Sequence, residues 1–180
     1  VILLEKTERP GKKILISGNG RCNLSNSRDL VSFIAQYGAK GKFLHSAYSR
    51  FFREELLAFL KRYGMDIVTE PDGKIYPVSQ NARDVVRLFQ EYLKDTCVDL
   101  RLDTGVNRIL VENKKVVGVE TASGVISADA VILATGGSSR PWTGSAGDGY
   151  RMAQEMGHTI IKLRPGLVPL VVEESELAKG

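Results

Sequence analysis

The feature that most constrains this chain is an apolar run that ends at two adjacent glycines. The run begins at Ala130, finishes at Ala134 and is followed by Thr135, Gly136 and Gly137. A run of β-branched and small apolar residues that stops at a glycine pair predicts a buried strand leading into a loop. Because glycine has no side chain, a ligand can closely approach the N–H groups of this loop, which suit phosphate oxygens. The segment therefore favours a nucleotide-binding α/β fold.

A second constraint comes from the first five residues, where the apolar run Val1–Leu4 ends at Glu5. In dinucleotide-binding sheets, an acid at a strand end hydrogen-bonds a ribose hydroxyl. Together with the glycine pair, this acid predicts a nucleotide-binding α/β chain, with FAD as the favoured nucleotide. In that fold the acid follows the glycine-rich phosphate loop by about 20 residues, but only four residues precede Glu5. We therefore expect the first strand, the glycine loop and the first helix upstream of Val1, in a longer protein.

The remaining pattern predicts a mixture of helices, short strands and turns. Apolar residues at three- and four-residue spacing predict helices, whereas short β-branched runs between turn signals predict strands. In the first half of the chain we expect an extended run at 12–16 and a helical insertion at about 30–64. Strands at 65–70 and 74–78 should follow, joined by a Pro-Asp-Gly turn, and then a helix from about 79 to 94. After it we expect an antiparallel meander at about 98–127 and a return to the parallel sheet at 129–134.

The composition is that of an ordinary globular protein and argues against several classes. Cys22 and Cys97 stand outside any C-x-x-C pattern, so we expect two free thiols. The two histidines have no metal-ligand spacing, and we expect no metal site. No apolar stretch approaches the roughly 20 residues that cross a bilayer. We therefore expect a cytoplasmic protein without membrane contact.

The formal net charge of +4 is unevenly distributed. Residues 1–62 hold 12 Lys and Arg against 5 Asp and Glu, whereas the remainder holds 13 against 16. A basic front could attract nucleic acid or face a diphosphate. It lacks helix-turn-helix and zinc-finger patterns and the interleaved aromatics of single-strand platforms. We therefore expect no nucleic-acid partner, and interpret these cations as a solvated surface with a few ligand-binding members.

Two polar loops carry the residue types that a nucleotide cofactor needs. The first, from Ser17 to Asn23, combines glycines for close approach with Arg21 for an anion or an electron-rich ring. A tight structural turn is the alternative interpretation of this loop. The second begins a predicted helix at Asp148, between two glycines. The N–H groups and positive dipole end of such a helix suit a phosphate or a reduced flavin, although Asp148 could equally serve as an N-cap.

Four segments together resemble a known family. They are Gly11–Asn23, Ala134–Pro141, Gly144–Tyr150 and Pro165–Leu170. In these segments the chain is similar to the YhiN/BaiN-type family of FAD-binding flavoproteins, which includes aminoacetone-oxidase-like enzymes. The resemblance covers nearly the whole chain, and its most specific block is Gly-Arg-Cys-Asn at residues 20–23. It implies an α/β fold with a glutathione-reductase-like, Rossmann-type FAD-binding sheet, an antiparallel meander and a helical insertion, truncated at both ends.

The resemblance also implies a domain division and a set of cofactor contacts. Residues 1–163 would be a partial FAD-binding domain that lacks its first βα unit, and 164–180 the start of a substrate-side domain. Glu5 would hold the adenosine ribose, and the backbone of Val106 would face adenine. The loop 17–23 would line the diphosphate and flavin ring. The full set of candidate cofactor-binding residues is Glu5, Lys6, Lys13, Ser17, Gly18, Gly20, Arg21, Cys22, Asn23, Val106, Ala134, Thr135, Gly136, Gly137 and Asp148.

These features predict a fragment of an FAD-dependent oxidoreductase that transfers hydride or electrons through flavin. We expect a small-molecule substrate, with NAD(P)H as one candidate electron donor, and the sequence singles out no catalytic acid or base. Two alternatives stay open: a non-catalytic nucleotide-binding module and a basic RNA-contacting domain. Because helix N-termini and glycine loops normally bind the diphosphate, we expect the fragment alone to bind FAD poorly and to be inactive.

Overall fold

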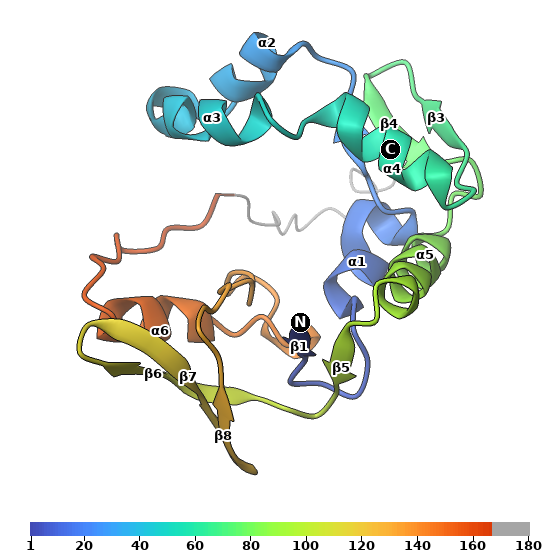
Figure 1. The fold of residues 1–180 in the computed structure, drawn as a ribbon. Coiled ribbons are helices and arrows are strands. Elements are labelled where there is room, and N and C mark those ends of the chain that lie inside the picture. The colour runs from blue at the N-terminus through green and yellow to red at the C-terminus, as the bar shows by residue number, and fades with distance from the viewer. Residues whose placement is uncertain (167–180) are drawn as a thin grey trace, which may run out of the picture.

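A computed structural model describes residues 1–166, and Figure 1 labels its elements. The α-helices are α1 (Lys12–Ile16), α2 (Leu30–Ala35), α3 (His45–Tyr48), α4 (Arg53–Arg62), α5 (Ala82–Asp95) and α6 (Asp148–Glu155). The 3₁₀ helices are η1 (Ser17–Gly20), η2 (Gly38–Leu44) and η3 (Pro141–Thr143). The strands are β1 (Ile2–Leu4), β2 (Ser25–Asn26), β3 (Ile67–Thr69), β4 (Lys74–Pro77), β5 (Asp99–Arg101), β6 (Val106–Glu112), β7 (Lys115–Thr121) and β8 (Gly124–Ser127). Within the described residues, no helix has the length and apolar character to cross a membrane.

The strands form one parallel pair and two antiparallel sheets. β1 runs parallel to β5, with Leu3 opposite Leu100. A parallel pair requires a crossover connection, and this crossover ends in α5, which precedes β5 in the chain. β6, β7 and β8 form an antiparallel meander, and β2, β4 and β3 form the second antiparallel sheet. The prediction of an α/β chain with an antiparallel meander is confirmed.

The β3–β4 hairpin forms at the predicted Pro-Asp-Gly turn. Gly73 has a φ of +82°, a conformation that glycine adopts without the steric penalty of a side chain. Its N–H donates to the carbonyl of Glu70 at 2.8 Å, and the N–H of Lys74 donates to the carboxylate of Asp72 at 3.0 Å. These bonds close the turn and bring β4 back antiparallel to β3.

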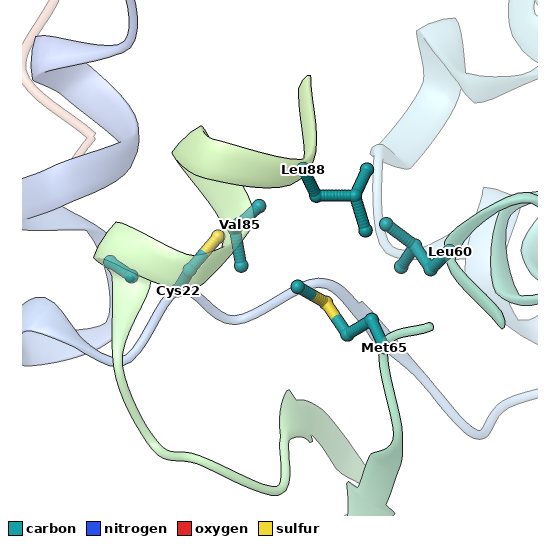
Figure 2. Packing of buried hydrophobic residues seen from close by; sticks show 6 residues of the cluster. Cys22, Leu60, Met65, Val85 and Leu88 are labelled. Atoms are coloured by element: carbon teal, nitrogen blue, oxygen red, sulfur yellow. The ribbon is translucent and has the colours of Figure 1, made fainter. Parts of the chain in front are cut away.

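The core forms where α4 and α5 meet the turn after η1. Asn81 caps α5, because its side-chain oxygen accepts a hydrogen bond from the N–H of Arg83 at 3.0 Å. Three-residue spacing then places Val85 and Leu88 on one buried face of the helix. The buried cluster, most of which is labelled in Figure 2, comprises Cys22, Leu60, Met65, Ala82, Val85 and Leu88. Helix faces rather than the parallel strands therefore build this core.

Residues 12–16 form the helix α1, so the prediction of an extended run is wrong. The N–H of Leu15 donates to the carbonyl of Gly11 at 3.1 Å, which closes the first helical turn. Gly11 has a φ of +81°, and a Cβ there would lie 2.9 Å from a methyl group of Val86 on α5. The helix forms because this close packing against α5 overrides the β-branched character of a short apolar run.

The segment 129–134 is not a buried strand, which corrects a central prediction from the sequence. The structure assigns no strand between residues 128 and 139, and the side chain of Ile132 is 92% exposed. Extended backbone becomes a strand only when a neighbouring strand satisfies its N–H and C=O groups. No strand within residues 1–166 pairs with this segment.

Two further boundaries differ from the predictions. The meander spans residues 106–127 rather than 98–127, because β5 pairs with β1 instead of joining it. The helical insertion at 30–64 is divided into α2, η2, α3 and α4, with Gly38 at a φ of +65° interrupting the first helical stretch. Of the predicted substrate-side segment 164–180, residues 167–180 lie outside the part of the chain that the structure describes.

Leu60 is fully buried, with 0% of its surface exposed, which makes it a test of the core. Leu60→Ala should lower the free energy of unfolding by about 2–5 kcal/mol, because truncation leaves a cavity between packed helices. Urea denaturation followed by circular dichroism measures this change. As a control, Val125→Ala on β8, where the side chain is 62% exposed, should change the free energy by less than about 0.5 kcal/mol. Equal effects of the two variants would contradict this location of the core.

Candidate functional site

Glu5 lies directly after β1, at the carboxyl end of the parallel pair. Its N–H donates to the carbonyl of Arg101 at 2.9 Å, which continues the pairing of β1 with β5. Its side-chain Oε1 accepts two hydrogen bonds from Thr7, one from the backbone N–H at 2.8 Å and one from the hydroxyl at 2.9 Å. Among the described residues, both bonds to this carboxylate go to Oε1. The carboxylate is therefore oriented by Thr7, and Oε2 makes no hydrogen bond to another described residue.

The start of α6 lies beside this acid. Gly147 precedes the helix with a φ of +92° and makes no side-chain cap. The ammonium of Lys6 lies 2.5 Å from a carboxylate oxygen of Asp148, the first residue of α6. This ion pair neutralises the charge that Asp148 would otherwise present to an anion. The N-terminus of α6 keeps the N–H groups and partial positive charge that favour a phosphate.

The glycine pair lies against α6 and the loop before it. Gly136 has a φ of +72°, and a Cβ there would lie 2.8 Å from the hydroxyl of Ser145. A Cβ at Gly149, on the first turn of α6, would lie 2.3 Å from the hydroxyl of Thr135. These approaches leave no room for larger side chains. The predicted phosphate loop and the helix start therefore form one continuous surface.

The loop 17–23 is organised by its own backbone and by the β3–β4 hairpin. The N–H of Cys22 donates to the carbonyl of Ser17 at 3.0 Å, which closes the loop. A Cβ at Gly18 would lie 2.7 Å from the backbone nitrogen of Asn23 and 3.0 Å from the ring of Tyr76. Glycine at this position allows the loop to pack directly on the hairpin.

Arg21 is held on three sides by residues of the hairpin and the turn after it. Its Nη1 donates to Glu70 at 2.6 Å and to Gln80 at 3.0 Å, and the guanidinium lies 3.9 Å from the centre of the Tyr76 ring. The bond to Glu70 raises the pKa of the guanidinium above its ordinary value. About a third of the side chain, 36%, stays exposed. Arg21 is therefore held in one position with part of its guanidinium accessible, and the carboxylate of Glu70 compensates its charge.

Cys22 and Lys13 lie in contrasting environments. The side chain of Cys22 is 7% exposed and packs in the core (Figure 2). Burial raises the pKa of its thiol, and a hydrogen bond with Ser17 opposes this shift in part. The thiol is therefore neutral, and only the backbone of Cys22 is left to face a ligand. Lys13 lies on α1 with an exposed side chain.

The structure gathers most of the candidate residues into two groups. The first group surrounds the start of α6 and contains Glu5, Lys6, Ala134, Thr135, Gly136, Gly137 and Asp148. Val106 lies next to it, because a Cβ at the preceding Gly105 would lie 3.5 Å from the side chain of Lys6. The second group is the loop with Ser17, Gly18, Gly20, Arg21, Cys22 and Asn23, and Lys13 belongs to neither group.

Sequence reasoning missed several residues that complete these groups. In the first group, Thr7 orients Glu5, and Ser145 faces Gly136. A threonine two residues after the acid is a signal for such a bond. In the second group, Glu70 and Gln80 bind Arg21. They lie 49 and 59 residues away from Arg21 in the chain, so no local spacing could have revealed them.

The first group suits the two ends of an adenosine diphosphate moiety. An oriented carboxylate matches ribose hydroxyls, and glycine backbone beside a helix N-terminus matches phosphate oxygens. In the second group, a fixed guanidinium matches an anion or an aromatic ring. Within residues 1–166, no cluster of His, Cys, Asp and Glu could hold a metal ion. The donor set therefore fits an organic dinucleotide such as FAD.

Curated relatives match nearly the whole of this chain but less than half of their own length. The chain is 35% identical over 180 residues to the 3-dehydro-bile acid delta(4,6)-reductase of Clostridium scindens, covering 100% of the chain and 43% of the relative. It is 26% identical over 174 residues to the ribosomal RNA dihydrouridine synthase of Escherichia coli, covering 97% and 42%. The chain thus spans under half the length of these relatives.

A solved structure shares the fold. It is described as the open conformation of a flavocytochrome c3 fumarate reductase, and the TM-score is 0.56 at 20% sequence identity. The match covers 87% of this chain and 36% of that chain. This likeness concerns the fold alone and agrees with the predicted Rossmann-type architecture.

The family comparison agrees with both the fold and the donor set. The model of the HI0933-like protein Rossmann domain matches residues 1–177, nearly the entire chain. This match confirms the resemblance inferred from the sequence motifs, the Rossmann-type fold and FAD as the cofactor. The chain belongs to the HI0933-like protein Rossmann domain family.

Proposed function

We propose that this chain is the cofactor-binding part of an FAD-dependent oxidoreductase that reduces a carbon–carbon double bond next to a carbonyl group. The observation that carries the proposal is the family match over residues 1–177. The relatives' names supply the reaction type. A delta(4,6)-reductase of a 3-dehydro bile acid and a dihydrouridine synthase both add two hydrogens to such a double bond. A non-catalytic module is less favoured, because both names denote enzymes.

The reaction adds one hydride and one proton across the double bond. Bound FAD is the group that supplies hydride chemistry, and NAD(P)H is the proposed source of the electron pair. The chain's own residues would bind the cofactor and orient it. We assign Glu5 to the ribose, and Gly136, Gly137 and the start of α6 to the diphosphate. Arg21 is assigned to the flavin end, where its guanidinium, held by Glu70, would donate hydrogen bonds to the ring or stack on it.

The remaining assignments are also proposals. Residues 1–163 would form the cofactor-binding part, and a small molecule with an activated double bond would be the substrate in a cytoplasmic protein. The bile-acid reductase is the relative that favours this substrate class, at 35% identity. A uridine in RNA is the second candidate, and the relatives that favour it are 26% and 28% identical to this chain.

Anaerobic reduction tests the reaction type. The protein, in the form that its own host cell produces, is loaded with FAD and reduced chemically. It is then mixed with either a 3-keto steroid carrying 4,6-double bonds or a uridine-containing RNA. We expect the flavin absorbance to return with one of these acceptors, and the double bond to be lost from the acceptor in equal amount. Reoxidation by neither compound, in a protein that holds FAD stoichiometrically, would contradict double-bond reduction on these two substrate classes.

Gly136 tests the predicted diphosphate contact. Gly136→Ala should weaken FAD binding by at least tenfold, because the added Cβ would enter the surface shared with Ser145 and the ligand. Gly157→Ala is a matched control, since Gly157 has a similar φ of +88° but nothing within 4 Å of an added Cβ. Isothermal titration with FAD compares the two variants. Equal affinities would show that only backbone strain matters at these positions.

Glu5 tests the predicted ribose contact. Glu5→Gln keeps an oxygen for the two bonds from Thr7 but removes the negative charge. It should weaken FAD binding about tenfold, the loss expected for a charge-assisted hydrogen bond. Glu8→Gln is the control, because Glu8 pairs with Lys12 on the exposed surface and should leave FAD affinity unchanged. If Glu5→Gln binds FAD normally while losing thermal stability, Glu5 has only a structural role.

A further inference from the structure

One turn of the chain contacts both halves of the first group of candidate residues. The turn comprises residues 140–145 and contains η3. On one side, a Cβ at Gly144 would lie 3.1 Å from a methyl group of Thr7 and 3.9 Å from Oε1 of Glu5. On the other side, the hydroxyl of Ser145 would lie 2.8 Å from a Cβ at Gly136. The turn is therefore wedged between the acid proposed for the ribose and the glycine pair proposed for the diphosphate.

Hydrogen bonds close this turn on itself. Arg140 and Ser145 form an antiparallel β-bridge, and the N–H of Gly144 donates to the carbonyl of Pro141 at 3.0 Å. Thr143 is buried, and its hydroxyl donates to the carbonyl of Arg140 at 2.7 Å. Proline at the start of η3 fixes the φ angle there. The turn therefore holds the side chains at its tip in a defined place beside the site.

Trp142 stands at the tip of the turn and is the only tryptophan in the sequence. Tryptophan is highly buried on average, but 66% of the surface of Trp142 is exposed. The guanidinium carbon of Arg140 lies 5.3 Å from the centre of its ring, within the range of a cation–π contact. Arg140 therefore orients the indole from one face, and the exposed fraction leaves the ring accessible to a ligand.

The face of the nucleotide base is the part of FAD to which no side chain has been assigned. Glu5 is assigned to the ribose, and the glycine pair with the start of α6 to the diphosphate. The backbone of Val106, expected to face adenine, can bond only the edge of the base. Adenine is a flat ring, and aromatic side chains stack on the faces of such bases. An accessible indole on the turn that contacts Glu5 supplies the missing contact.

We propose that Trp142 stacks on the adenine ring of bound FAD, with Arg140 as a positioning residue that orients the indole. This contact requires the ribose to lie at Glu5 and so rests on the proposed function. Trp142 is two residues from Gly144, and two residues of chain span at most about 7 Å, which keeps the indole near the ribose end. The candidate residues for the flavin end belong to a different segment, the loop 17–23. The indole is therefore assigned to adenine rather than to the flavin ring.

Binding of the two halves of FAD tests the proposal. The protein, in the form that its own host cell produces, is freed of cofactor and titrated calorimetrically with FAD, with ADP and with FMN. Trp142→Ala should weaken the binding of FAD and of ADP about tenfold each, the loss expected for one stacked base, and should leave FMN affinity unchanged. Trp142→Phe should recover most of the lost affinity, because it keeps an aromatic ring. Trp142→Leu keeps apolar bulk without the ring and should also bind ADP more weakly than the unmodified protein.

Fluorescence gives a second readout that does not depend on affinity or turnover. The emission of the unmodified protein minus that of Trp142→Phe isolates the signal of Trp142. Saturating ADP should quench this signal, because a stacked base contacts the indole directly. Pyrophosphate, which can occupy the diphosphate site but carries no base, should leave the signal unchanged. Quenching by both compounds to the same extent would show that Trp142 does not contact adenine.

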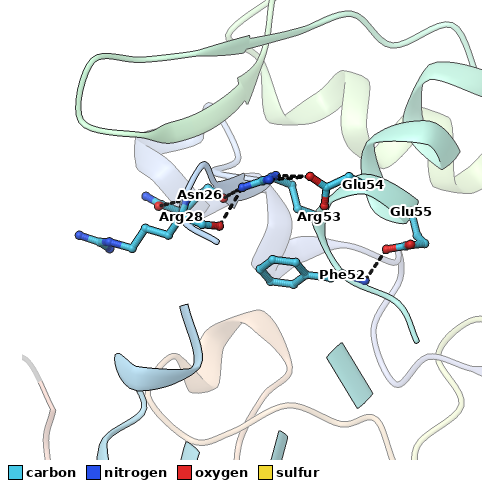
Figure 3. A network of polar contacts seen from close by, with 6 residues as sticks. All are labelled: Asn26, Arg28, Phe52, Arg53, Glu54 and Glu55. Atoms are coloured by element: carbon cyan, nitrogen blue, oxygen red, sulfur yellow. Dashed lines mark hydrogen bonds and ion pairs between the residues drawn. The ribbon is translucent and has the colours of Figure 1, made fainter. Parts of the chain in front are cut away.

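The matched control is Phe43→Ala, which removes another exposed ring. Phe43 lies on η2 and is 88% exposed. Its segment, residues 27–52, contains none of the candidate cofactor residues and is held at its base by Arg53, whose Nη1 donates to the carbonyl of Arg28 at 2.8 Å (Figure 3). Phe43→Ala should therefore bind FAD, ADP and FMN with unchanged affinity.

The outcomes separate this contact from the proposed reaction. Normal ADP affinity in Trp142→Ala overturns the proposal, and so do equal losses of ADP and FMN affinity, which would mean that the turn only shapes the diphosphate site. Failure of the unmodified protein to bind ADP overturns the placement of adenosine at this site. None of these measurements involves turnover, so a protein that binds FAD but reduces neither proposed acceptor leaves this test intact.

Discussion

The packing of α5 against Cys22, Leu60 and Met65 is the contact on which the rest of the structure depends. α1 lies against the same helix so closely that a Cβ at Gly11 would be 2.9 Å from Val86. The chain passes directly from α5 into β5, and β5 is the parallel neighbour of β1. The position of α5 therefore sets where β1 ends, and with it the place at which an acid can meet a ligand.

The same core anchors the second group of candidate residues. Because the side chain of Cys22 is buried, its neighbours on the loop are held at the surface of the core. Arg21 is then fixed from outside by Glu70 and Tyr76, which belong to the hairpin region. A guanidinium held in this way needs no reorganisation to donate a further hydrogen bond. Packing and electrostatics therefore act on adjacent residues of one loop.

The sequence pattern correctly predicted those elements whose formation depends on neighbouring residues in the chain. The Pro-Asp-Gly turn requires a positive φ at its glycine, and the hairpin formed there. The alternation of short runs and turns also located β6, β7 and β8. The strand predicted at 129–134 did not form, because a strand depends on a partner that its own sequence does not specify. The partners of Arg21 were equally out of reach, since Glu70 and Gln80 come from distant positions in the chain.

The segment 27–52 contains none of the candidate cofactor residues, which lie around the end of β1, the start of α6 and the loop 17–23. Chemistry that belongs to a cofactor needs a binding site that stays constant, and the end of β1 with the start of α6 is the site proposed for it. Substrate choice can then change through segments that leave the core without entering it. The segment 27–52, which contains α2, η2 and α3, is of this kind, because Arg53 bonds the carbonyl of Arg28 at its base and none of its residues belongs to the buried cluster around α5. A family whose relatives act on a bile acid and on ribosomal RNA is what such a division permits.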